Sequence, residues 1–388
     1  MTPKVETTML NKVPAITIFF WIIKVLCTTV GETVSDFLNV NLGFGLSGTS
    51  VVMGIVLAVA LGVQFAYNKY VPWIYWLVVV LISVFGTLLT DNLTDNMGIP
   101  LQYSTIFFSI CLMLVFLAWY ASEKTLSIHS IFTRKREAFY WLAILFTFAL
   151  GTATGDLLAE GLALGYATTG LIVCGIILVI AILWRLGLNG VLSFWIIYIM
   201  TRPLGASLGD YLSQTTENGG LGLGASITSL IFLAAILITI IFLSLSKKDL
   251  LPSSNQTAEP IQKGGLWQTL VVVGAMIIIA FAGYHIRSAS LTNSETAAYS
   301  WSNLSEFRTI EEDVLSMVKS GDLAGAKVRV KDLETAWDNA AAYLKAADGA
   351  RWTEVDDGID AVLRSLRSSH PTVEEATKTL NSSLQQLK

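Results

Sequence analysis

Long apolar stretches separated by short polar connections fill most of the chain up to residue 286. Each stretch is long enough for a helix to cross a bilayer, which takes about 20 residues. The stretches lie at 14–36, 46–67, 71–91, 103–121, 138–156, 163–184, 189–210, 223–245 and 266–286. After residue 286, apolar residues recur every three to four positions, which predicts amphipathic helices at 305–320, 322–347, 352–368 and 371–387. We therefore expect an all-α polytopic membrane protein with nine transmembrane helices and a C-terminal helical bundle.

The composition agrees with this pattern. The chain has 388 residues, of which 53% are hydrophobic and 14% are charged, whereas a soluble protein carries about 25% charged residues. This balance excludes a soluble enzyme, a disordered chain and a free nucleic-acid-binding protein. The sequence contains no Walker A loop and no H-E-x-x-H motif. We therefore expect a protein that is not an enzyme and does not bind nucleic acid.

Lys and Arg residues gather on one side of the predicted spans. They occur in the N-terminal tail and in the loops after the second, fourth, sixth and eighth spans, and the other four loops have none. By the positive-inside rule, the N-terminus is cytoplasmic and the ninth span runs outward. We expect a multi-pass protein of the bacterial cytoplasmic (inner) membrane. Its predicted parts are a transmembrane domain at 1–248, a cytoplasmic linker at 249–265, a ninth helix at 266–286 and an extracytoplasmic domain at 287–388.

The first eight spans contain an internal repeat. An aromatic residue followed by Trp occurs four times, with Gly ten residues after each Trp and Asp five residues after each Gly. The residues concerned are Trp21, Gly31 and Asp36; Trp76, Gly86 and Asp91; Trp141, Gly151 and Asp156; and Trp195, Gly205 and Asp210. Each copy is one outgoing and one returning helix, so the repeats cover about 13–67, 70–121, 136–185 and 188–246 and share one orientation in the membrane.

On these motifs the chain resembles a bacterial integral membrane family of unknown function, built from four tandem two-helix repeats with a characteristic Trp in each. The resemblance covers about residues 13–246. It implies the repeat architecture and brings no activity with it.

The Trp and Gly residues of the repeat are expected to be structural. About 22 Å of helix separates each Trp from its Asp, which places the Trp toward the cytoplasmic side and predicts an anchor belt at the membrane interface. The Gly residues are expected to let helices approach closely.

The four Asp residues allow two interpretations. In the first, each Asp caps the turn into the returning helix. In the second, Asp36, Asp91, Asp156 and Asp210 converge at the outer mouth and bind cations, as acidic rings do in channels. Further charges belong to the candidate cation path because charge within a membrane span is costly and functional. These are Lys24, Glu32, Asp95, Glu160 and Arg202.

Two main classes of function remain open, beside a third, an intramembrane enzyme acting on lipid, for which no nucleophile–base arrangement stands out. The first is a transporter or channel-like protein for a small cation, expected to be divalent and coupled to protons. An oxygen-only site of this kind favours Mn²⁺, Mg²⁺ or Ca²⁺ as the ligand, with the four repeat Asp residues as metal ligands. The alternative is a membrane-anchored sensor or scaffold that acts through the extracytoplasmic helices. The expected partners are the lipid bilayer, the small cation, and a second copy of the chain or a periplasmic protein bound by the C-terminal domain.

Overall fold

The computed structural model describes residues 11–42, 45–97, 99–214, 216, 220–249, 265–294, 300–368 and 371–388, and these are predominantly helical. The chain divides into two compact units. The first comprises Met1–Leu157 and Gly165–Ala275, and the second comprises Leu158–Leu164 and Met276–Lys388. Each unit has its own hydrophobic core.

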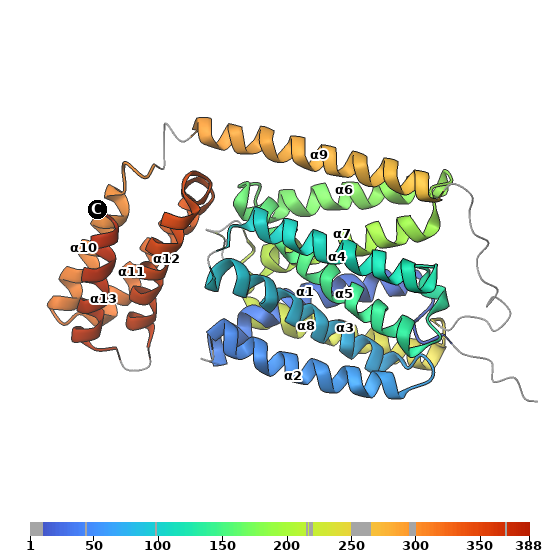
Figure 1. The fold of residues 1–388 in the computed structure, drawn as a ribbon. Coiled ribbons are helices and arrows are strands. Elements are labelled where there is room, and N and C mark those ends of the chain that lie inside the picture. Colours follow the sequence, from blue (N-terminus) through green and yellow to red (C-terminus); the bar gives the residue numbers. More distant parts are fainter. Residues whose placement is uncertain are drawn as a thin grey trace, which may run out of the picture. The chain divides into compact units, whose positions relative to one another are not determined.

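The first unit contains eight long helices and the start of a ninth (Figure 1). They are α1 (Ile18–Leu42), α2 (Gly45–Ala66), α3 (Pro72–Asp91), α4 (Leu101–Glu123), α5 (Arg134–Asp156), α6 (Tyr166–Arg185), α7 (Gly190–Ser213), α8 (Ala225–Ser246) and α9 (Gly265–Ser294). Within the described ranges, these nine helices are long and apolar enough to cross a membrane. The nine predicted spans are confirmed as apolar helices, as expected of a multi-pass membrane protein.

Local chemistry explains several helix ends. Pro72 opens α3, where a missing backbone N–H costs nothing. The Asn189 side chain accepts hydrogen bonds from the backbone N–H groups of Val191 and Leu192 at the start of α7. Gly224 lies directly before α8 with φ +77°, a conformation that favours glycine.

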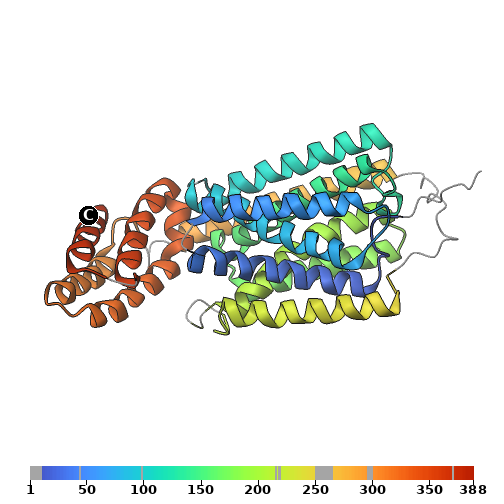
Figure 2. The ribbon, with the colours of Figure 1, turned by 90° about the horizontal axis from the view of Figure 1, so that it is seen from below.

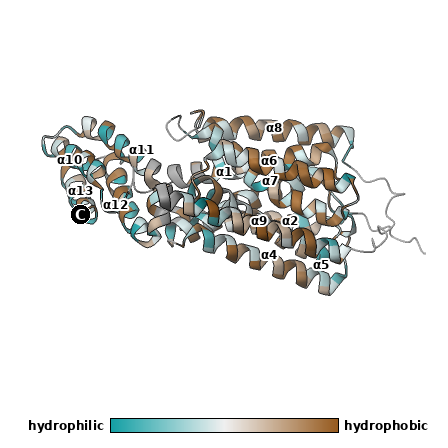
Figure 3. Ribbon diagram, turned by 90° about the horizontal axis from the view of Figure 1, so that it is seen from above, coloured by the Kyte–Doolittle hydropathy of each residue, from teal (hydrophilic) through white to brown (hydrophobic). Residues whose placement is uncertain are grey.

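The odd-numbered helices form an inner ring. α1 packs against α3, α3 against α5, α5 against α7, and α7 against α1, so the ring is closed. The helices of this unit run alongside one another (Figure 2). Between 56% and 72% of the residues in the inner spans are buried, against 17% to 28% in the spans of α2, α4, α6 and α8. The even-numbered helices therefore form an outer layer with predominantly hydrophobic surfaces (Figure 3).

Each outer helix packs mainly on the inner helix of the following repeat. α2 lies along α3, α4 along α5, α6 along α7, and α8 closes the circle on α1. The two helices of one repeat are therefore not the main packing unit. This interlocking arrangement ties each repeat to the next one around the ring.

The second unit contains a four-helix bundle of α10 (Ser305–Lys319), α11 (Leu323–Ala347), α12 (Gly349–Arg367) and α13 (Val373–Gln386). All four predicted helices are present, and Trp337 and Trp352 stack at 4.2 Å in the core. The sequence pattern also predicts that Val328 belongs to the apolar stripe of its helix and that Thr353 is the N-cap of the next helix; both expectations are wrong. Val328 is 74% exposed, because Val330 is the residue that faces the core. Thr353 is not an N-cap, because α12 begins earlier, with Asp348 accepting from the backbone N–H of Arg351.

Candidate functional site: the charged core of the inner ring

The repeat glycines are the contact points of the inner ring. A Cβ added to Gly31 or Gly205 would lie 1.8 Å from a hydroxyl oxygen of the neighbouring inner helix, so only glycine fits there. The contacts run in one direction around the circle: Gly31 on Ser83, Gly86 on Phe148, Gly151 on Arg202, and Gly205 on Thr28. All four contacted residues stand eight positions before the repeat Asp. The four inner helices therefore share one register.

The aromatic pairs form a closed layer within the same ring. Each first aromatic residue contacts the Trp of the following repeat: Phe20 with Trp76 at 5.6 Å, Tyr75 with Trp141 at 5.3 Å, Tyr140 with Trp195 at 6.4 Å, and Phe194 with Trp21 at 5.6 Å between ring centroids. Three of the four Trp residues are buried and Trp21 is half-buried. The expected interfacial anchor belt is therefore wrong, because these rings pack against each other in the protein interior.

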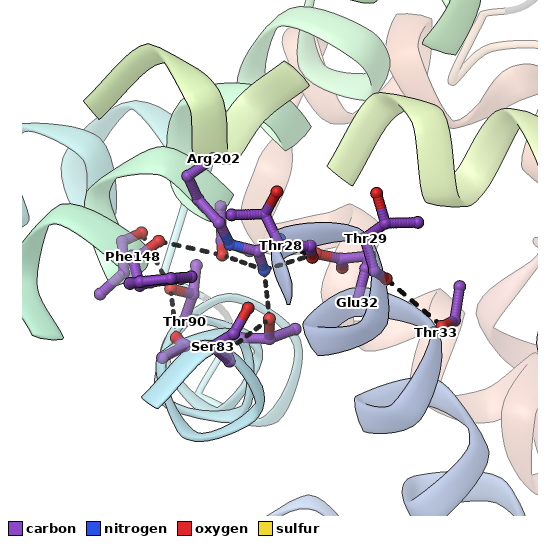
Figure 4. Close-up of polar contacts among 12 residues, drawn as sticks. Thr28, Thr29, Glu32, Thr33, Ser83, Thr90, Phe148 and Arg202 are labelled. Carbon is purple, nitrogen blue, oxygen red and sulfur yellow. Dashed lines mark hydrogen bonds and ion pairs between the residues drawn. The ribbon is translucent and has the colours of Figure 1, made fainter. Parts of the chain in front are cut away.

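Arg202 joins all four repeats at the centre of the ring (Figure 4). The side chain comes from α7 and is fully buried. Its Nη2 donates to Glu32 Oε2 at 2.6 Å, to Thr152 Oγ1 at 2.7 Å and to Thr87 Oγ1. Its Nη1 donates to the backbone oxygen of Thr28 at 2.9 Å.

The three side chains that accept from Arg202 occupy equivalent positions. Glu32, Thr87 and Thr152 each stand four residues before the repeat Asp in the first, second and third repeats. The fourth repeat has Ala206 at that position. One arginine therefore bridges the four repeats, and among the described residues Glu32 is the carboxylate that pairs with it.

In the common register of the inner helices, Lys24 stands one helical turn nearer to the aromatic pairs than Arg202 does. Its side chain is 1% exposed, and its Nζ lies 3.5 Å from the ring centroid of Phe148 and 4.2 Å from that of Tyr198. No hydrogen-bond acceptor reaches this Nζ in the part of the chain that the structure describes. The ammonium is therefore held by two aromatic faces rather than by a carboxylate.

The repeat Asp residues stand at the opposite end of the inner helices from the Trp residues. Asp91 and Asp156 end α3 and α5 and are half-buried, and Asp210 is buried in α7. The side chains of Asp36 and Asp95 lie outside the described residues. Asp91 and Asp156 are followed directly by the π-helical turns η1 (Asn92–Asn96) and η3 (Leu157–Gly161), where Glu160 is exposed.

A metal site of acidic and soft ligands is not formed by the described residues. Across those ranges, no three or more His, Cys, Asp or Glu side chains gather closely enough to hold a metal ion. The described geometry therefore brings together Glu32, Arg202 and Lys24, and it does not gather Asp91, Asp156 and Asp210 into a metal-binding group.

A second buried charge pair lies at the Trp end of the unit. Lys12 Nζ is 2.5 Å from Glu137 Oε2, and the other carboxylate oxygen accepts from Gln64 Nε2 at 3.0 Å. Both charged side chains are buried. Sequence reasoning placed Lys12 only among the positive-inside charges. The signal it missed is an acidic residue, Glu137, in the first turn of an apolar span.

One match to an enzyme motif is accounted for by the fold. Gly205, Ser207 and Gly209 have the G-x-S-x-G spacing of esterases, which the expectation of a non-enzymatic protein overlooked. That motif needs a sharp turn from strand to helix, whereas these residues lie inside α7. Gly205 and Gly209 instead pack against Thr28 and Thr29 of α1.

Comparison with known proteins agrees with the repeat. No curated protein and no solved structure matches the chain. The model of the family described as Repeat of Unknown Function (DUF347) matches residues 19–70, 74–125, 139–186 and 193–249. These four segments coincide with the four helix pairs and cover more than half of the chain. The protein is therefore a member of the DUF347 repeat family, with four tandem repeats.

Proposed function

We propose that the four-repeat unit is a membrane transporter or channel-like protein for a small cation, in which Arg202 is the resident counter-ion of Glu32. The observation that carries the proposal is the buried Arg202–Glu32 ion pair at the centre of the ring. Ionisable groups inside membrane helices are costly and mark ion pathways. A closed ring of four quasi-equivalent helices offers such a pathway along its centre.

The proposed mechanism is competition for the Glu32 carboxylate. A cation or a proton that arrives from the Asp end of the inner helices takes the place of the guanidinium on Glu32. Arg202 then keeps Thr87, Thr152 and the Thr28 backbone oxygen as acceptors, so it can move away from Glu32 without losing every partner. These three threonine acceptors thus lower the free-energy cost of breaking the ion pair between Arg202 and Glu32.

The orientation belongs to the same proposal. With Lys and Arg of the loops in the cytoplasm, the Asp end of the inner helices faces outward and the Trp end faces inward. Entry of the cation is then from the outside of the bacterial inner membrane, past Asp91, Asp156 and Asp210. In this proposed orientation the ninth span runs outward, so residues 287–388 are extracytoplasmic.

Flux in reconstituted vesicles tests this proposal. The full-length protein is placed in liposomes, and uptake of Mn²⁺, Ca²⁺, Mg²⁺, Na⁺ and K⁺ is measured separately. Glu32→Gln removes the charge and keeps the size, and it should lower uptake of the transported ion at least about tenfold, since a charge-assisted hydrogen bond contributes about 1.5–3 kcal/mol.

The matched control is Glu312→Gln, which changes an exposed carboxylate of α10 in the same way. This control should take up the ion at the wild-type rate. Absence of uptake of all five ions by the wild-type protein, or unchanged uptake by a folded Glu32→Gln variant, would contradict the proposal.

A further inference from the structure

Among the described side chains at the centre of the inner ring, Arg202 and Lys24 can carry positive charge and Glu32 can carry negative charge. The guanidinium of Arg202 is paired with Glu32. Within the described residues, Lys24 Nζ contacts the faces of Phe148 and Tyr198 and has no hydrogen-bond acceptor. A cation–π contact contributes about 0.5–2 kcal/mol, and a charge at mid-membrane costs about 2.5–3.5 kcal/mol on translocon scales. The two ring faces therefore offset that cost only in part.

The two buried cations, Arg202 and Lys24, differ in whether they can release a proton. A guanidinium keeps its proton under all conditions met by a protein, whereas an amine can lose and regain one. Arg202 is therefore a fixed charge. Lys24 is the cation in this core that can exchange a proton.

Groups that pass protons flank Lys24 on the Trp side. In the common register, Tyr75 and Tyr140 stand one turn from the Lys24 layer, and their hydroxyl oxygens are 2.5 Å apart. The Tyr198 hydroxyl is buried and has no hydrogen-bond partner within the described ranges. Tyr75 and Tyr140 therefore lie between the Lys24 layer and the Trp end of the ring, and Tyr198 lies in the Lys24 layer itself.

A carboxylate flanks Lys24 on the Asp side. Glu32 lies two turns further along α1, about 12 Å at 1.5 Å per residue. The groups that face Lys24 or its surroundings from the packed helices are Cys27 on α1, Tyr75 on α3, Tyr140 on α5, and Tyr198 and Arg202 on α7. Apart from Arg202, each of these groups is uncharged when it holds its proton.

We propose that Lys24 is a proton-binding site at the centre of the ring and that the proton is the coupling ion of the transporter. This inference rests on the proposed function and adds the coupling ion and the residue that carries it. In one step the Nζ–H bond of the ammonium breaks, the electron pair stays on nitrogen, and the proton passes toward the Tyr75 and Tyr140 hydroxyl oxygens on the Trp side. In a second step the lone pair of the neutral amine takes up a proton that arrives from the Glu32 side, which restores the ammonium.

The charge state of Lys24 then acts on the Arg202–Glu32 pair. The protonated form places a second cation beside Arg202 and repels it, and the neutral form removes that repulsion. Proton binding at Lys24 therefore changes the electrostatic free energy with which the core holds Arg202, whose departure from Glu32 the transported cation requires. This link makes proton movement and cation movement interdependent.

The experiment measures proton entry and cation uptake on the same vesicles. The full-length protein is reconstituted with a pH-sensitive dye in the lumen, and a pH gradient is imposed with K⁺ and valinomycin present to prevent build-up of charge. Lys24→Arg keeps the positive charge and cannot release a proton, and Lys24→Met removes both. Both variants should lower proton entry about 100-fold or more, the range expected when a group that transfers protons is lost.

Lys69→Met is the matched control, since Lys69 is an exposed loop lysine. It should move protons at the wild-type rate. Size-exclusion profiles confirm that each variant is folded, and Lys24→Arg provides the test if Lys24→Met does not fold.

The outcomes separate this inference from the proposed function. Loss of proton entry in Lys24→Arg supports the inference. Wild-type cation uptake without proton entry, or wild-type proton entry in Lys24→Arg, overturns the inference and leaves the proposed function standing. If proton entry depends on Lys24 but none of the five cations is taken up, the proposed cation transport is wrong, and the assignment of Lys24 as a proton-binding site stands.

Discussion

At the scale of single residues, the buried charges of the ring are unequal. Among the described residues, Arg202 has four acceptors, Glu32 forms an ion pair with Arg202, and Lys24 contacts two aromatic faces. A buried ion pair adds little net stability, but removing one partner leaves an uncompensated charge. The Arg202–Glu32 pair should therefore be sensitive to single substitutions and tolerant of a paired one.

Arg202→Met should lower the free energy of unfolding by about 3–5 kcal/mol, because Glu32 then keeps its charge without a partner. The double variant Arg202→Met with Glu32→Met should recover most of this loss. Thermal unfolding in detergent, followed by tryptophan fluorescence, measures the effect. Arg185→Met changes an exposed arginine and should leave the midpoint unchanged. A double variant no more stable than the single one would refute this account of the pair.

At the scale of helices, close packing between neighbouring inner helices depends on four glycines, which have no side chain. Gly31, Gly86, Gly151 and Gly205 abut the next inner helix, and the contacted residues are fully buried. Gly62 in α2 and Gly175 in α6 have open space where a Cβ would lie. Sequence position alone does not separate these two kinds of glycine, whereas the repeat register does.

Gly31→Ala and Gly205→Ala should each destabilise the unit by about 1–3 kcal/mol, the usual cost of overpacking. Gly62→Ala and Gly175→Ala should be neutral or stabilise by about 0.5–1 kcal/mol, because alanine restricts the unfolded chain. The measurement is the unfolding midpoint of the four variants in one detergent. Equal effects in both pairs would show that the inner contacts are not as close as described.

At the scale of the whole molecule, the second unit contains its own buried ionisable group. Glu311 on α10 is fully buried, and its Oε1 accepts from Ser383 Oγ of α13 at 2.6 Å. Burial raises the pKa of Glu311 from its ordinary value of 4.5 to about 7, and the Ser383 hydrogen bond opposes this shift. The neutral acid is therefore favoured in the folded bundle.

The bundle should lose stability as the pH rises from about 4.5 to about 7, because the unfolded chain ionises Glu311 first. A shift of this size corresponds to about 3 kcal/mol in all. Hydrogen exchange of peptides from α10 and α13, measured on the full-length protein at pH 5 and pH 8, reports the change. Glu311→Gln should remove the pH dependence and Glu312→Gln should keep it. A dependence that survives in Glu311→Gln assigns the effect to another group.

Much of this architecture could be predicted from the pattern of the chain. Apolar length gave the nine spans, and three-to-four spacing gave α10 to α13. The direction in which a span faces could not be predicted, because a helix in lipid is apolar on both its protein side and its lipid side. For that reason Trp76 and Trp141 were expected at the interface, although they are buried. Val328 and Val330 show the same ambiguity within one turn.

Lys24, Glu32 and Arg202 were among the candidates that the sequence predicts, because each is a charged residue within an apolar span. Their geometry could not be predicted. The sequence contains no sign that Arg202 reaches Thr87 and Thr152 of other repeats, since this depends on ring closure. The aromatic surroundings of Lys24 are also a property of closure, because Phe148 and Tyr198 come from two different repeats.

The closing contact of the ring joins the first inner helix to the last one. Gly205 of α7 meets Thr28 of α1, and α8 covers α1. During synthesis, α1 therefore emerges from the ribosome with Glu32 and Lys24 long before their neighbours on α7 exist. Until the fourth repeat is inserted, these two charges stay in an unfinished assembly without Arg202. The order of translation makes the last repeat the one that completes the first.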